Sequence, residues 1–203
     1  MKLIGMLDSP YVRRVAISAK CLGIPLEHAS VSVFRHFEQF QQINPVVKAP
    51  TLVLDDGEVL MDSTLIIDYL EALAAPGKSL ISDNPAQRLR SLRLIGLALA
   101  ACEKSVQLYY ERNLRPAEIQ YAPWVERVEG QLAAAYSALE RELEKQPLKT
   151  DGSIAQDGIS LAVAWSFTNL VVPDQVDAAQ FPLINAFTAY AEGLEVFIDT
   201  PIE

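Results

Sequence analysis

The sequence contains few of the residues that build metal centres and disulfide frameworks. Its 203 residues include two cysteines, Cys21 and Cys102, and two histidines, His28 and His36. The cysteines lie far apart without a CxxC spacing, and neither histidine has a second ligand at helical spacing. We therefore expect reduced, buried thiols of a cytoplasmic protein, and no metal site.

The sequence also lacks the features that nucleic-acid and membrane binding require. Its 17 Lys and Arg residues are scattered among 26 Asp and Glu residues, for a net charge of −9, so no positive stripe is available to neutralise a phosphate backbone. No apolar run approaches the ~18 residues of a membrane span, and the apolar N-terminal stretch is too short for the core of a signal peptide. We expect neither nucleic acid nor membrane as a partner.

Apolar residues make up 50% of the chain, which is enough for one large core or two smaller ones. Residues 2–7 are typical of a short buried strand. Ser9-Pro10 then predicts the start of a helix over 10–22, with serine as the cap and proline at the first helical position. Gly23 is expected to end this helix. A second strand near 26–33 implies a parallel pair joined by a right-handed crossover.

The following segment completes a βαβαββα order. A short helix over 34–43 precedes two chain breaks at 44–45 and 48–50. Strands over 51–54 and 59–61 flank the turn sequence Asp-Asp-Gly-Glu, which indicates a hairpin. Ser63 is expected to cap a helix that reaches about Leu73.

The second half of the chain is predicted to be all helical. Residues 74–79 have the composition of a linker, so we expect one domain over 1–75 and an all-α domain over 84–203. Helices are predicted over about 85–112, 121–145, 153–171 and 181–194. Ser153 followed by Gln156 indicates a capping box, and the nearly all-apolar run behind it predicts a helix in the middle of the bundle.

Three short motifs stand at the ends of these predicted elements: Ser9-Pro10-Tyr11-Val12-Arg13-Arg14, then Lys48-Ala49-Pro50, then Asp62-Ser63. In this order and spacing they resemble the cytosolic glutathione S-transferase family, in its bacterial, serine-type form, over essentially the whole chain. The resemblance implies a thioredoxin-like α/β domain followed by an all-α domain. It also implies a homodimeric enzyme that binds glutathione and transfers its thiolate to a small hydrophobic electrophile.

The resemblance assigns the catalytic role to Ser9. A hydroxyl at a helix N-terminus can donate a hydrogen bond to the glutathione thiolate and lower the pKa of that thiol. Taken alone, a serine at this position is more often simply a helix cap.

The resemblance further implies a cis peptide bond before Pro50, a conformation found in only ~5–6% of X-Pro bonds. This bond would turn the N–H and C=O of Ala49 toward the cysteinyl backbone of glutathione. The family usually has a branched residue where Ala49 stands, which should affect shape more than binding. Lys48 would meet the glycyl carboxylate, or be merely solvated.

Asp62 and Ser63 would bind the γ-glutamyl end of glutathione. The carboxylate of Asp62 would take the ammonium, and the Ser63 hydroxyl with the free helix N–H groups would take the carboxylate. The alternative is a pair of helix-capping residues. We expect this pair at the same edge of the sheet as Ser9.

A pocket for the electrophilic second substrate is assigned to Tyr11, Tyr109, Tyr110 and Arg112. A helix end that mixes aromatic and charged residues is more often surface or interface, and Tyr11 is more often a packing residue. Two other functions stay open: a glutathione-dependent reductase or dehalogenase, and a non-enzymatic interaction or regulatory module of the same fold. Thiol-disulfide chemistry normally requires a cysteine at the start of the first helix. Cys21 lies near the end of that helix, which argues against the reductase.

Overall fold

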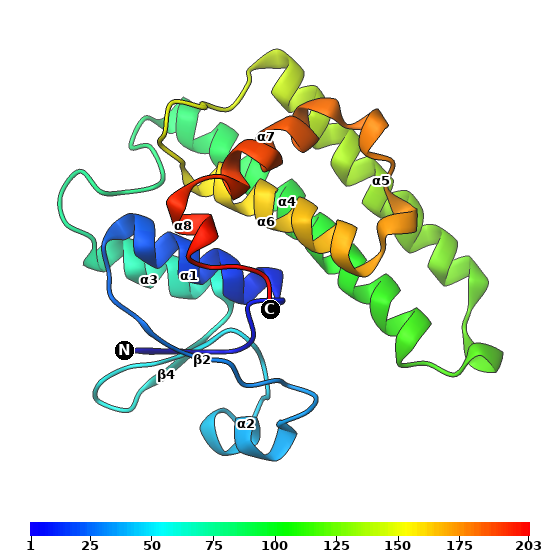
Figure 1. Ribbon diagram of the computed structural model, residues 1–203, viewed down its shortest axis with the longest axis horizontal. Helices are drawn as coiled ribbons and strands as arrows, with labels where there is room; N and C mark the ends of the chain where they lie inside the picture. The colour runs from blue at the N-terminus through cyan, green and yellow to red at the C-terminus, as the bar shows by residue number, and fades with distance from the viewer. The chain divides into compact units, whose positions relative to one another are not determined.

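The computed structural model describes residues 1–203 as two compact units (Figure 1). The first unit consists of Met1–Ile81 together with Leu194–Glu203, and the second of Ser82–Gly193. The predicted domain limits, 1–75 and 84–203, stay a prediction. By compactness, residues 194–203 group with the first unit.

A four-stranded mixed sheet forms the centre of the first unit. Its order is β2 (Glu27–Ala29), β1 (Lys2–Ile4), β3 (Thr51–Val53) and β4 (Val59–Met61). β1 pairs in parallel with β2 and antiparallel with β3, and β3 pairs antiparallel with β4. The predicted parallel pair, the hairpin and the thioredoxin-like βαβαββα order are confirmed.

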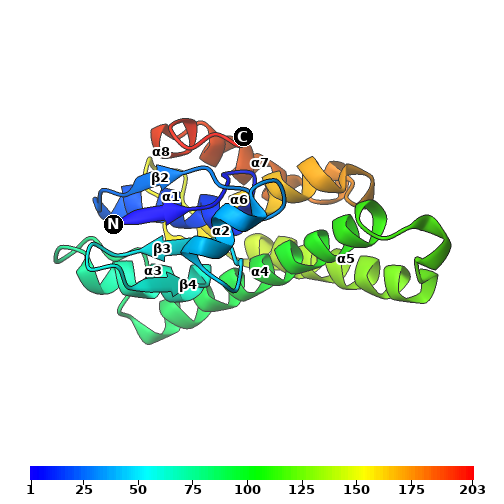
Figure 2. The same ribbon diagram turned by 90° about the horizontal axis from the view of Figure 1, so that it is seen from below.

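Helices flank this sheet on both faces. α1 (Pro10–Leu22) and α3 (Ser63–Leu73) pack against each other, and α2 (Phe37–Ile43) lies on the opposite side of the strands (Figures 1 and 2). Successive strand residues point to opposite faces, so β1 can serve both layers. Ile4 packs with Val31 and with Phe40 of α2.

In the first unit, β1, β2 and α2 are each at least three residues shorter than the sequence indicates, and β3 ends one residue early at Val53. β1 ends at Ile4 rather than residue 7 because Gly5 has φ +137, outside the extended conformation of a strand. β2 loses its partner there and ends at Ala29. α2 begins at Phe37 because residues 32–36 form a turn, in which the Ser32 hydroxyl accepts hydrogen bonds from two backbone N–H groups.

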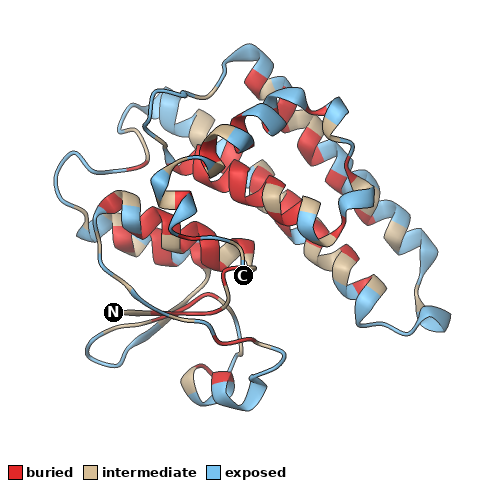
Figure 3. Ribbon diagram, in the orientation of Figure 1, coloured by how far each residue is buried: buried red, intermediate tan, exposed pale blue.

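The second unit is all helical, as predicted. Its long helices are α4 (Pro85–Asn113), α5 (Ala122–Lys145), α6 (Gln156–Val171) and α7 (Pro182–Glu192), with the 3-10 turns η1 (Ala117–Ile119), η2 (Pro173–Gln175) and η3 (Ala178–Gln180). α4 packs on α5 and α6, and α6 packs on α7. α6 is buried along most of its length (Figure 3), which confirms its central place. No helix of the protein is both long enough and apolar enough to cross a membrane.

The predicted capping box at Ser153 is wrong. α6 begins at Gln156, its N-cap is Ala155, and no side chain caps it. The Ser153 hydroxyl donates instead to the carboxylate of Asp151, two residues earlier. The Ser153 hydroxyl, which the pattern assigned to a helix N–H, is thus bonded to a carboxylate that precedes the helix.

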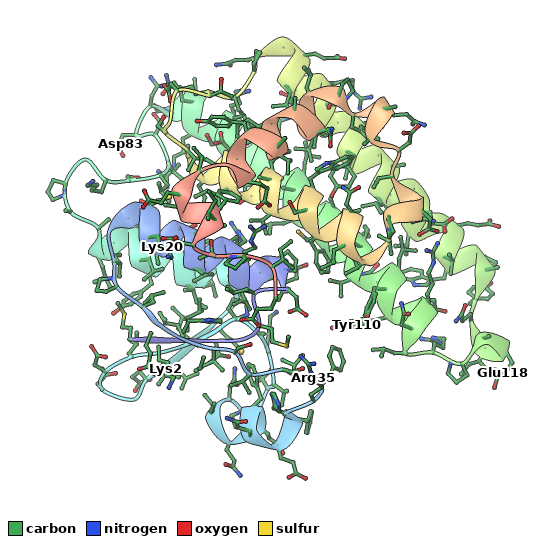
Figure 4. All side chains as sticks on the ribbon, viewed as in Figure 1. Lys2, Lys20, Arg35, Asp83, Tyr110 and Glu118 are labelled. Carbon is green, nitrogen blue, oxygen red and sulfur yellow. The ribbon has the colours of Figure 1, made fainter.

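The last predicted helix, over 181–194, is also interrupted. α7 ends at Glu192, Gly193 follows, and the chain forms the short helix α8 (Glu195–Ile198), which packs on α1 in the first unit. Arg13 of α1 holds this segment, since its Nε donates to the carbonyl of Thr200 at 2.8 Å. Lys20, near the end of α1, lies 3.5 Å from the Asp199 carboxylate (Figure 4).

Candidate functional site

The register of the sheet brings the three motifs to one edge. Ile4 at the end of β1 lies opposite Thr51 at the start of β3, and Thr51 lies opposite Met61 at the end of β4. The segment with Ser9 follows β1, the segment 48–50 precedes β3, and the segment 62–63 follows β4. All three segments therefore lie at the same edge of the sheet, the one formed by the ends of its strands.

Gly5 allows two of these segments to approach each other. An added Cβ would lie 2.6 Å from Cγ2 of Val12 on α1 and 3.1 Å from Cβ of Ala49. Its φ of +137 is in addition one that other residues rarely adopt. A glycine at this point therefore lets the proline loop and the first turns of α1 meet.

Ser9 caps α1 with its backbone alone. Its extended conformation lets its carbonyl accept the N–H groups of Val12 and Arg13 at 3.1 and 2.9 Å. Its hydroxyl makes no capping hydrogen bond, and the residue is partly exposed. The structure therefore disfavours the alternative in which Ser9 is only a side-chain cap.

Asp8 places a carboxyl group directly before Ser9. Partial burial raises its pKa above the usual value, and the nearby Glu203 carboxylate adds to this effect. A hydrogen bond from the Ser9 N–H and the charge of Arg35 act in the opposite direction. The start of α1 thus carries a carboxyl group whose ionisation is disfavoured.

The proline loop has the conformation that the resemblance implied, with a cis peptide bond between Ala49 and Pro50. Two buried polar side chains hold it. Nδ2 of Asn44 donates to Oγ1 of Thr51 at 2.9 Å, and that hydroxyl donates to the carbonyl of Lys48 at 2.7 Å. Neither the N–H nor the C=O of Ala49 has a hydrogen-bond partner in the structure. The loop therefore presents, at Ala49, an N–H and a C=O that no other group of the structure uses.

The start of α3 differs from the prediction, because its N-cap is Asp62 and not Ser63. Asp62 has φ +76, and its Oδ1 accepts the N–H of Thr64 at 2.9 Å. Ser63 is the first helical residue, and 4% of it is exposed. Nζ of Lys48 lies 3.8 Å from Oδ2 of Asp62, with both side chains about half exposed. The structure thus pairs two residues that were predicted to bind different ends of one ligand.

A buried arginine lies behind this first turn of α3. Arg14 of α1 is 2% exposed, and its Nη1 donates to Oγ of Ser63 at 3.0 Å and to Oγ1 of Thr64 at 3.2 Å. No separate role was predicted for Arg14, Thr64, Asn44 or Thr51. Their roles arise from contacts between segments, for which no local pattern is a signal.

The residues predicted for a second-substrate pocket are distributed over both units. Tyr11 is the second residue of α1. Tyr109 and Tyr110 lie near the end of α4 with ring centroids 6.3 Å apart, and Tyr110 is exposed (Figure 4). Arg112 forms ion pairs with Asp174 at 2.9 Å and Glu129 at 3.0 Å, which gives it a structural role within the second unit. A shared pocket for these residues stays a prediction.

The protein contains no group of three or more His, Cys, Asp or Glu side chains arranged to hold a metal ion. Burial raises the pKa of the Cys21 thiol, which disfavours its thiolate form. Neither cysteine forms a disulfide bond.

Comparison with known proteins gives three concordant results. Residues 3–79 match the family description "Glutathione S-transferase, N-terminal domain". The chain is 30% identical over 175 residues to the "Uncharacterized GST-like protein YibF" of Escherichia coli K12, with 85% of each chain covered. It is 29% identical over 147 residues to a maleylacetoacetate isomerase of Pseudomonas aeruginosa, covering 68% of this chain and 69% of that protein.

The fold comparison agrees with the sequence comparison. A solved glutathione transferase family member from Pseudomonas fluorescens Pf-5, with bound glutathione, superimposes with a TM-score of 0.86. It is 28% identical in sequence, and the match covers 100% of this chain and 98% of that one.

Proposed function

This chain belongs to the glutathione S-transferase family, and from that membership we propose that it binds reduced glutathione and transfers its thiolate to a small hydrophobic electrophile. The observation that carries this proposal is the Ser9 hydroxyl, which caps nothing at the start of α1. It lies at the sheet edge that also presents the unpaired Ala49 peptide group and the start of α3. The glutathione bound by the Pseudomonas fluorescens relative supports the same ligand here.

In the proposed complex, each group of glutathione meets a group of opposite character. The cysteinyl backbone pairs with the N–H and C=O of Ala49. The γ-glutamyl ammonium meets the carboxylate of Asp62, and its α-carboxylate meets the Ser63 hydroxyl and the helix N–H groups. Lys48 meets the glycyl carboxylate. Its exposed ion pair with Asp62 contributes only ~0–1 kcal/mol, so ligand binding can open it at little cost.

The chemistry assigned to this site is ionisation of the thiol and attack by sulfur. The thiol proton leaves to solvent, and the Ser9 hydroxyl donates a hydrogen bond to the thiolate beside the N-terminal dipole of α1. Lowering the thiol pKa by ~2 units corresponds to roughly 2.7 kcal/mol. The thiolate then forms a C–S bond to the electrophilic carbon. In a substitution the electron pair of the broken bond departs with the leaving group. In an addition to an activated double bond the π pair moves toward the activating group and is then protonated by solvent.

We also propose that the protein is a homodimer. Leu89 and Leu92 lie about one turn apart on α4 and are 70% and 48% exposed. Contiguous exposed leucines on a helix are typical of an interface. Light scattering coupled to gel filtration should give twice the mass of one chain, and a monomer would contradict the proposal.

The proposed function is tested by calorimetric titration of the purified protein with reduced glutathione. We expect saturable binding in the micromolar to millimolar range, weakened by ~1.5 kcal/mol or more in Asp62→Ala. The matched control is Asp68→Ala, an exposed aspartate farther along α3, which should bind as the wild type does. No saturation at millimolar glutathione would reject the transferase function and favour an interaction module.

A second candidate is isomerisation of a substrate with an activated double bond, favoured by the similarity to maleylacetoacetate isomerase. In that reaction the thiolate would add to the double bond and leave again, so glutathione would be recovered unchanged. Mass spectrometry of the products separates the two reactions, because only transfer leaves a stable conjugate.

A further inference from the structure

The start of α3 is supported from behind by a cation that solvent does not reach. Arg14 is 2% exposed, and one nitrogen of its guanidinium, Nη1, donates to both hydroxyl oxygens of the first turn, at 3.0 Å to Ser63 and 3.2 Å to Thr64. Nη1 carries two hydrogens, one for each oxygen. The arginine thus fixes both hydroxyls at the same time.

This arrangement decides which way the two hydroxyl hydrogens point. Each oxygen accepts a hydrogen bond from Arg14, so each hydroxyl must turn its own hydrogen away from the guanidinium. Neither hydroxyl has another hydrogen-bond partner in the structure. A hydroxyl whose oxygen accepts from a cation is also polarised and becomes a better donor. Two aligned donors therefore stand beside the N–H groups of α3.

We propose that Arg14 is a positioning residue that makes the start of α3 selective for the α-carboxylate of a γ-glutamyl thiol. This inference rests on the proposed binding of glutathione. Arg14 does not touch the ligand and acts through the hydroxyls of Ser63 and Thr64. The other end of the site has only the half-exposed ammonium of Lys48, so selectivity for the ligand resides at the γ-glutamyl end.

Arg13 provides a matched control, because it shares the helix and the burial of Arg14 but makes different contacts. It precedes Arg14 on α1 and is also 2% exposed. Its Nε donates to the carbonyl of Thr200 at 2.8 Å, and its guanidinium lies 5.3 Å from the ring centroid of Phe197. Its loss should weaken the packing of residues 194–203 without changing the hydroxyls of α3.

The experiment is a calorimetric comparison of two ligands with three forms of the full chain. The ligands are reduced glutathione and γ-aminobutyryl-cysteinylglycine, which lacks only the α-carboxylate. We expect Arg14→Gln to weaken glutathione binding about tenfold and to leave binding of the analogue unchanged within about twofold. Arg13→Gln should leave both affinities unchanged and lower the melting temperature. Arg14→Lys, which keeps the charge, should recover part of the loss.

An equal loss for both ligands in Arg14→Gln would show a purely structural role and overturn the inference alone. So would an unchanged glutathione affinity. Wild-type protein that binds neither ligand would overturn the proposed function and this inference with it.

If Arg14→Gln does not fold, Thr64→Val provides the test, because Thr64 is exposed. It removes one of the two positioned hydroxyls and should weaken glutathione binding several-fold without affecting the analogue. Equal effects on both ligands, or none on glutathione, would again overturn the inference.

Discussion

At the starts of α4 and α7 in the second unit, polar side chains accept free helix N–H groups, whereas at the start of α1 in the first unit the N-cap side chain accepts none. At the start of α4, Oδ1 of Asn84 accepts two backbone N–H groups, at 3.1 and 3.2 Å. At the start of α7, the buried carboxylate of Glu140 on α5 accepts the N–H groups of Leu183 and Ile184 at 2.8 and 3.0 Å. At the start of α1, the side chain of Ser9 accepts none.

The interior of the second unit follows the same rule. The buried Tyr136 hydroxyl lies 3.0 Å from the carbonyl of Ala164 and 2.6 Å from Oγ1 of Thr168, which in turn lies 2.7 Å from Oγ of Ser105. Burial raises the pKa of Tyr136 well above its usual value, so the phenol stays protonated. Polar groups in the second unit thus stabilise the fold, and those at the sheet edge of the first unit are left available to a ligand.

The largest expected effect concerns stability of the second unit. Glu140→Ala would leave two N–H groups of α7 without acceptors, that of Ile184 buried and that of Leu183 partly buried, so the free energy of unfolding should fall by about 2–4 kcal/mol. Urea denaturation followed by circular dichroism measures this. Glu144→Ala, an exposed glutamate one turn later on α5, should change stability little. A loss in Glu140→Ala no larger than in this control would contradict the comparison.

The next effect concerns chemistry in the first unit. Ser9→Ala should raise the pKa of the bound glutathione thiol by roughly 1–2 units, or roughly 1.4–2.7 kcal/mol, as read from thiolate ultraviolet absorbance against pH. The free energy of unfolding should change by less than ~0.5 kcal/mol, because the hydroxyl caps nothing. A clear loss of stability with an unchanged thiol pKa would make Ser9 a cap and break the comparison.

Asn84→Ala is the counterpart of Ser9→Ala in the second unit. It removes an actual cap and should lower the free energy of unfolding by ~1 kcal/mol, with glutathione affinity unchanged. Asp83→Asn serves as the control, since Asp83 is exposed and precedes the cap (Figure 4). Equal stability losses in Asn84→Ala and Ser9→Ala would show that both helix ends are built alike.

The smallest expected effect is a pH dependence at Asp8. Its pKa is higher in the folded protein than its usual 3.8, so ionisation of Asp8 opposes folding. This penalty is absent well below 3.8, develops as pH rises through the raised pKa, and is complete at neutral pH. The Asp8→Asn protein should therefore have a slightly higher melting temperature than the wild type at neutral pH. In acid the two melting temperatures should be the same. Calorimetry at both pH values tests this, and an Asp8→Asn protein that melts below wild type at neutral pH would refute it.

The sequence predicted elements with explicit ends better than those without them. α1 was predicted with its observed bounds because Pro10 begins it and Gly23, in the left-handed conformation, ends it. The start of α6 was missed because the Ser153 hydroxyl, which was expected to accept a helix N–H, donates instead to Asp151. A local pattern does not decide between these two partners.

The site shows the same limit. The positions of Ser9, Ala49 and Asp62 follow from short motifs at the ends of strands. The role of Arg14 depends on hydrogen bonds to residues 49 and 50 positions away in sequence. Such a pairing is created by the register of the sheet and by the packing of α1 on α3, and no sequence spacing encodes it.

The contact of Arg13 with Thr200 has a consequence for the order of folding. The two residues are 187 positions apart, and all of the second unit lies between them in sequence. A ribosome makes α1 before the second unit and residues 194–203 after it, and chains begin to fold as they emerge. The unit proposed to bind glutathione is therefore the first to begin folding and the last to be completed, because its closing segment arrives only after every helix of the other unit has been made.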